Sequence, residues 1–209
     1  MQLSSIDDNV PLLGADLLAR LEAAWAAQGA PALALLAPGL TDDEMSEIVS
    51  PLGLHLPLEA RIWWGWHDGA HWRPNNERTP ERALGPSLQY MPLRDAVEDY
   101  LMDRQIFREV EGDPEPFRPA AYFPITRGTG PILCDCSVSE GAPTPIYYAH
   151  THDSTPENMQ TPIVRSFGEM VSWWIDALED GIWRWDSSRE SWTYSSEASD
   201  APREAGGLL

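Results

Sequence analysis

The sequence predicts an α+β fold, a single domain in which helices pack on a mostly antiparallel sheet. Segments 41–52 and 166–181 each begin with a helix-capping signal and continue with apolar residues at helical spacing. Between them, β-like runs at 121–126, 131–137 and 145–149 are joined by short connections that contain glycine. Short connections favour an antiparallel meander, and 209 residues suit one domain with extensions.

The N-terminal half predicts three helices. Leucines repeat every four residues over 13–27 and indicate the first helix. Thr41 and Glu44 form a capping-box pattern that begins the second, and Pro57 suits the entry to the third. Asp68-Gly69 is a natural stop for that helix.

The second half begins with a polar, proline-rich loop at 70–86, a short strand at 87–90 and a helix from Pro92. After the meander, Ser166 is expected to cap the last helix, with Glu169 completing the box. Four aromatic residues near the C-terminus are expected to add an edge strand: Trp183, Trp185, Trp192 and Tyr194. The chain is thus divided into an N-terminal helical extension (1–40), a main domain (41–181) and a tryptophan-containing tail (182–209).

The charge balance excludes several classes of partner. There are 14 Lys plus Arg against 33 Asp plus Glu, a net charge of −19, which repels phosphate backbones and anionic lipids. No apolar run approaches the roughly 20 residues of a membrane helix, and Asp7 and Asp8 replace the basic start of a signal peptide. Two cysteines at 134 and 136 favour a reduced environment, so we expect a cytoplasmic protein.

Several short motifs follow one another in a particular order. They are the capped helix at 41, Leu52-Gly53-Leu54-His55-Leu56-Pro57, the aromatic helix ending at Asp68-Gly69, Met91-Pro92-Leu93-Arg94-Asp95-Ala96, Phe123-Pro124-Ile125, Cys134-Asp135, Ile146-Tyr147-Tyr148 and Ser166-Phe167. Their order and spacing resemble the SUKH superfamily, which includes the fungal Smi/Knr-type cell-wall regulators. The resemblance runs from residue 41 to 180. It implies an α+β domain that binds proteins rather than catalyses a reaction, and bacterial members mostly act as immunity proteins against toxins.

Metal chemistry is not expected, and neither is a cofactor. His150, His152 and Asp153 are the most metal-like cluster, but nothing at recognisable spacing supplies further ligands. His67 and His71 have the spacing of a helical zinc pair, yet Asp68-Gly69 should break the helix between them.

The cysteine pair and the aspartate between them each have a structural and a functional interpretation. Cys134 and Cys136 would share one face of a strand. The simpler interpretation is that they are small buried residues, and the alternative is that their thiols take part in metal or redox chemistry. The resemblance marks Asp135 as a recurrent acidic position, which either ties down a turn or lines a partner surface.

Ten tryptophans beside many carboxylates raise the alternative of a carbohydrate-active protein, because sugars stack on aromatic rings and glycosidases use paired acids. Against it, Trp25, Trp63, Trp66 and Trp174 fall on apolar helix faces, where packing explains them. The sequence also has no Gly-rich phosphate loop, no Gly-x-Ser-x-Gly elbow and no convincing Ser/His/Asp set.

We therefore predict a non-enzymatic immunity protein that neutralises a basic toxin, such as a nuclease, by direct binding. A regulatory scaffold like the fungal proteins is the alternative. The predicted partner surface includes Trp64, Trp66, Asp68 and Trp72, because large aromatics beside a charge are typical of interface hot spots. Asp135 is added to it on the strength of the resemblance. A simpler reading is that Trp64 and Trp66 complete the core and that the acidity aids solubility.

Overall fold

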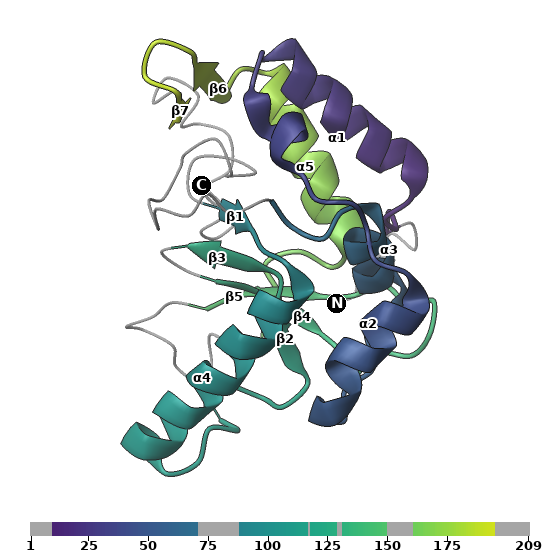
Figure 1. Cartoon of the computed structure of the whole chain (residues 1–209), viewed down its shortest axis with the longest axis vertical. Helices are drawn as coiled ribbons and strands as arrows, with labels where there is room; N and C mark the ends of the chain where they lie inside the picture. The colour runs from purple at the N-terminus through teal and green to yellow at the C-terminus, as the bar shows by residue number, and fades with distance from the viewer. Residues whose placement is uncertain (1–9, 71–87, 117, 129–130, 150–160, 195–209) are drawn as a thin grey trace, which may run out of the picture.

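The computed structural model describes residues 10–70, 88–116, 118–128, 131–149 and 161–194, and confirms the α+β class (Figure 1). Its helices are α1 (Ala15–Ala27), α2 (Asp42–Val49), α3 (Leu58–Trp66), α4 (Leu93–Glu111) and α5 (Phe167–Glu179), with 3-10 turns at Pro31–Leu35 and Ser50–Leu52. Its strands are β1 (Leu88–Tyr90), β2 (Tyr122–Pro124), β3 (Thr126–Gly128), β4 (Ile132–Asp135), β5 (Ile146–Tyr148), β6 (Trp183–Asp186) and β7 (Ser191–Tyr194).

The meander is antiparallel, as its short connections predicted. Strand β4 pairs with β2 on one side and β5 on the other, with Cys134 opposite both Phe123 and Ile146. Ile125 joins β2 to β3, and β3 pairs with β1. The Ile125 N–H donates to the Ile132 carbonyl, 2.8 Å away, so the β2–β4 pairing continues past the end of β2.

The two faces of this sheet are both apolar but differ in their neighbours. Phe123, Ile125 and Ile132 are fully buried in the main core with the helices. Leu133, Tyr147 and Ala149 form a second buried cluster, and Tyr122 stacks on Tyr147 with ring centroids 4.3 Å apart. The alternation is the one expected for a strand in which successive side chains point to opposite faces.

Both predicted capping residues begin their helices. The Thr41 hydroxyl accepts from the Glu44 N–H, and the Glu44 carboxylate accepts from the Thr41 N–H in return. Ser166 accepts from the Glu169 N–H in the same way, but the Glu169 carboxylate accepts from the N–H of Arg165, one residue before the cap. The local signals therefore located α2 and α5 correctly.

The two flanking regions take part in the same core as the middle of the chain. Helices α1 and α5 lie side by side (Figure 1), and Leu21, Trp25 and Trp174 are fully buried in that core. The predicted edge strand after α5 is instead a separate hairpin, in which β6 pairs only with β7 among the strands of the described residues. Its Trp183 contacts both Trp173 and Trp174.

Candidate partner-binding surface

Trp64 belongs to the core, so its assignment to the partner surface was wrong. Its side chain is fully buried, its Nε1–H donates to the Met91 carbonyl at 3.3 Å, and its ring meets Phe123 edge-on at 5.8 Å. The reason is that α3 is buried over a wide face. Glu59 and Trp63 lie along one line of the helix surface, Ala60 and Trp64 lie along the neighbouring line, and all four are buried. The simpler reading of Trp64 is the correct one.

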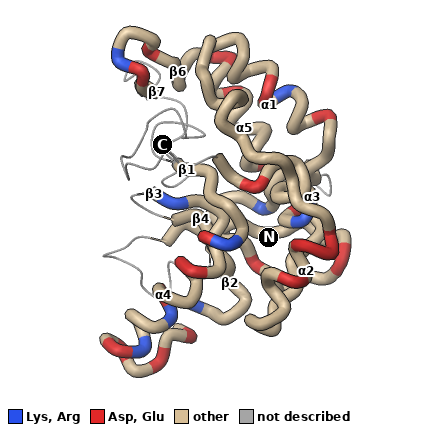
Figure 2. The backbone as a smooth tube through the Cα atoms, in the orientation of Figure 1, with Lys and Arg blue, Asp and Glu red and all other residues tan. Residues whose placement is uncertain are grey.

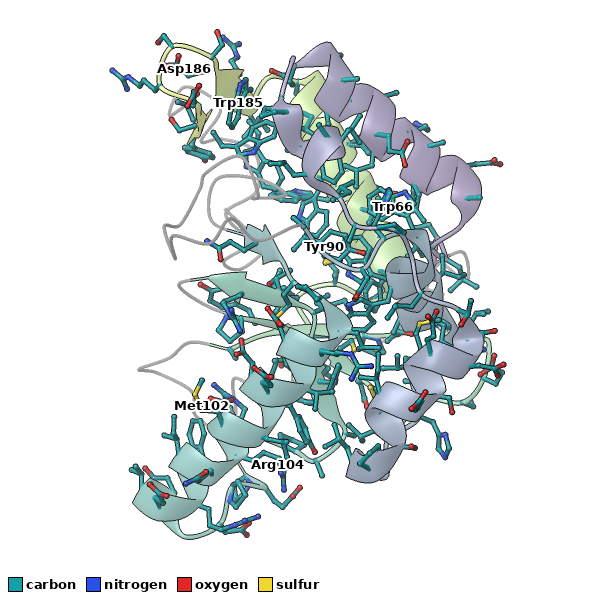
Figure 3. The ribbon with its side chains drawn as sticks, in the orientation of Figure 1. Trp66, Tyr90, Met102, Arg104, Trp185 and Asp186 are labelled. Atoms are coloured by element: carbon teal, nitrogen blue, oxygen red, sulfur yellow. The ribbon has the colours of Figure 1, made fainter. Side chains whose placement is uncertain are left out.

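Trp66 lies at the boundary between the core and the surface (Figure 3). Its ring stacks on Trp25 with centroids 5.9 Å apart, and its Nε1–H donates to the Glu22 carboxylate at 2.6 Å. With Leu18 and Ile62 it lines a hollow of about 370 Å³ between α1 and α3. An aromatic edge in an apolar hollow beside a carboxylate has the composition of a binding surface.

Asp68 has a structural task that the sequence did not reveal. Its Oδ1 accepts from the Leu93 N–H at 2.7 Å, so it supplies an acceptor to the first turn of α4 from outside that helix. Burial raises the pKa of Asp68. Gly69 has a φ of +72°, and a Cβ there would lie 2.3 Å from the Pro92 nitrogen, which explains the glycine.

Replacing Asp68 by alanine is expected to lower the free energy of unfolding by about 1 kcal/mol, because the Leu93 N–H loses its acceptor. Asparagine keeps an acceptor oxygen, so Asp68→Asn is expected to lose less stability.

The raised pKa of Asp68 means that the folded protein holds the Asp68 proton more tightly than the unfolded chain does. Its contribution to stability therefore falls as the pH rises above 3.8 through the raised pKa, and Asp68→Asn should remove that dependence. Urea melts across pH test both points, and equal stability of Asp68→Ala would contradict the capping role.

Asp135 ends β4 and ties down the following turn, which is one of its two predicted roles. Its Oδ1 accepts from the Ser137 N–H at 2.8 Å and from the Ser137 hydroxyl at 2.6 Å. Trp72, the remaining residue of the predicted surface, lies outside the described residues.

Some of the candidate metal ligands lie within the described residues, and others do not. His71, His150, His152 and Asp153 lie outside the described residues, and no group of three His, Cys, Asp or Glu side chains fit for a metal occurs within them. Cys134 and Cys136 have sulfurs 3.9 Å apart on β4 and just after it. Burial of Cys134 raises its thiol pKa, which favours the unreactive protonated form.

Glu59 is the residue that sequence reasoning missed. Its carboxylate is buried in the first turn of α3 and accepts three backbone N–H groups, from Leu13 at 2.8 Å, Thr144 at 2.7 Å and Gly168 at 3.0 Å. These donors come from the segment before α1, the loop before β5 and the first turn of α5. No local pattern could have indicated this, because the partners are 46 to 109 residues away.

The sequence was also compared with known protein families. The model of the SMI1 / KNR4 family (SUKH-1) matches residues 39–173, well over half of the chain. The chain belongs to the SMI1/KNR4 family. No curated protein matched the sequence.

SMI1/KNR4 membership confirms the superfamily that the order of the motifs indicated. The matched segment contains Glu59, Asp68 and Asp135, together with the whole of the meander. Helix α1 and the β6–β7 hairpin lie outside it, although Trp25 and Trp183 are buried in the common core. No helix in the described parts of the chain is long and apolar enough to cross a membrane.

Proposed function

We propose that this protein is an immunity protein, which binds a basic toxin directly and thereby blocks the toxin's active site. The observation that carries the proposal is the net charge of −19 on a member of the SMI1/KNR4 family. Acidic positions occur along α1, α2 and α4 and in the β6–β7 turn (Figure 2). A partner with a basic surface would be attracted to this chain from any of these sides.

A nuclease toxin fits this charge best, because enzymes that bind phosphate backbones carry surfaces of Lys and Arg. An acidic protein that covers such a surface competes with the nucleic acid for the same cations. Inhibition of this kind requires tight complementary contact and no reaction on the inhibitor.

The described tryptophans weaken the carbohydrate-active alternative. Six of them are buried, namely Trp25, Trp63, Trp64, Trp174, Trp183 and Trp192, and Trp66, Trp173 and Trp185 are half-buried. A sugar platform needs an accessible ring face, and these rings are engaged in packing instead.

The deciding experiment is co-expression with the product of the gene next to this one. If that product stops growth when expressed alone, co-expression of this chain should restore growth, and the two proteins should co-purify. Failure to bind or neutralise a toxic neighbour would reject the immunity role and favour the alternative of a regulatory scaffold.

Association with the toxin is expected to depend on salt. Raising the ionic strength from about 0.05 M to about 0.5 M should slow association by about tenfold or more, because screening removes long-range attraction. The dissociation rate should change much less. Stopped-flow mixing over a salt series measures both rates, and an association rate that does not respond to salt would contradict electrostatic recruitment.

A further inference from the structure

The C-terminal half of α4 exposes a line of large apolar side chains. Met102, Ile106 and Val110 are spaced by four residues and are 57%, 49% and 72% exposed, and together they are called the α4 stripe. Leu101, which is 52% exposed, lies beside it. The described residues contain six exposed large hydrophobic side chains, and these four are on one helix.

Helix α4 is held in place by its other side. Leu93, Ala96 and Tyr100 are buried, and the Tyr100 hydroxyl donates to the Ala120 carbonyl at 2.9 Å. Arg104 donates to the Arg118 carbonyl at 2.8 Å, and Met102 and Arg104 lie on opposite sides of the helix in Figure 3. The three residues of the stripe are therefore on a different side of α4 from the residues that anchor the helix, and none of them is buried.

The stripe borders a hollow at the edge of the sheet. Met102 lines this hollow, of about 100 Å³, with Tyr122 and Pro124 of β2 and Leu133 of β4. That volume is enough for several water molecules or one apolar side chain. Figure 1 shows the second half of α4 projecting from the body of the molecule, and Met102 is the residue of the stripe that also lines the hollow.

The surroundings of the stripe are acidic. Residues 98–116 contain seven Asp or Glu and two Arg. Glu98, Glu109 and Glu111 are exposed on α4 itself, and Asp113 is exposed just after it. Arg104, one of the two cations, is paired with Glu115. An apolar line with carboxylates on its borders is complementary to a segment that has apolar residues on one side and Lys or Arg beside them.

We propose that the α4 stripe, with its acidic border, is a docking surface for an amphipathic basic segment of a protein partner. Apolar side chains of that segment cover Met102, Ile106 and Val110, one of them entering the hollow beside Tyr122, and its cations lie near Glu98 and Glu109. A second copy of this chain is a poor occupant, because it would bring two acidic borders together. The inference rests on the proposed function, in which the segment belongs to the toxin.

The surface can be tested with defined probes. The first is a synthetic amphipathic helix of leucine and lysine, and its control is a peptide of the same composition with the helical periodicity scrambled. Met102→Ala, Ile106→Ala and Val110→Ala are combined in one variant, which should keep its melting temperature because alanine is the best helix former and the sites are exposed. Leu12→Ala with Tyr194→Ala is the matched control, since both side chains are exposed and neither belongs to α4.

We expect the amphipathic peptide to bind the full chain more tightly than the scrambled peptide does. The triple α4 variant should lose about tenfold or more in affinity, whereas the control pair should change little. Glu98→Gln with Glu109→Gln should weaken binding and flatten its salt dependence. Equal binding of both peptides, or an unchanged affinity in the triple variant, overturns the docking surface. So does self-association of the wild type in sedimentation that the triple variant abolishes, because the occupant is then a second copy.

The same variants separate this inference from the proposed function. A wild-type chain that neutralises the neighbouring toxin, together with a triple variant that neutralises it equally well, rejects the α4 surface alone. A wild-type chain that neutralises no toxin while its α4 stripe binds the amphipathic peptide rejects the immunity role and leaves the docking surface standing.

Discussion

Replacing Glu59 by glutamine is expected to lower the free energy of unfolding by about 3 kcal/mol or more. The carboxylate accepts three backbone N–H groups through two oxygens, and an amide offers only one acceptor oxygen. Its NH₂ group would face either the Thr144 N–H or the N–H groups of Leu13 and Gly168. A buried donor that faces another donor loses its hydrogen bond and recovers none from water.

Urea unfolding measures this loss, and Glu47→Gln is the matched control because it makes the same chemical change at an exposed position of α2. The control should unfold at the wild-type urea concentration. An unaltered midpoint for Glu59→Gln would mean that the three hydrogen bonds contribute little to holding α1, β5 and α5 together.

Replacing Trp174 by alanine is expected to lower the free energy of unfolding by about 3 to 5 kcal/mol. Its side chain is fully buried, and its ring lies 6.0 Å from that of Trp63 and 6.5 Å from that of Trp183. The cavity left by the indole would open where α5 meets α3 and the hairpin. Such a loss is a large part of the stability of an ordinary domain.

Trp174→Phe distinguishes packing from hydrogen bonding at this site. The Trp174 Nε1–H is buried and has no hydrogen-bond partner among the described residues, so phenylalanine removes a donor that is not satisfied. We expect Trp174→Phe to retain much more stability than Trp174→Ala in the same urea melts. If alanine were tolerated while partner or sugar binding disappeared, Trp174 would be a recognition residue and its place in the core would be wrong.

Local sequence signals predicted the elements that are held by local interactions. Thr41 and Ser166 cap their helices through N–H groups three residues away, and glycine-containing turns produced the antiparallel β2–β4–β5 meander. Periodicity also assigned Trp174 to the core correctly, because α5 has one continuous apolar face.

The errors concern residues whose environment is set by distant parts of the chain. Trp64 was assigned to a surface because it is a large aromatic residue near Asp68, but α3 is buried on two adjacent lines and Trp64 belongs to the core. The assignment of Asp68 to a partner surface stays a prediction, but its hydrogen bond from Leu93, 25 residues later, was not foreseen. Neither contact has a signature in the neighbouring sequence.

The hydrogen bonds of the Glu59 carboxylate also determine how short a fragment of this protein can be and still fold. The family match begins at residue 39 and ends at 173, inside α5, so it excludes Leu13, the last residues of that helix and Trp183. A fragment cut at those limits would keep Glu59 but lose one of its three donors, and would leave the α1-facing side of α5 in water. Recombinant fragments, chimeras and fusions of this chain should therefore contain residues 10–194 as one continuous segment.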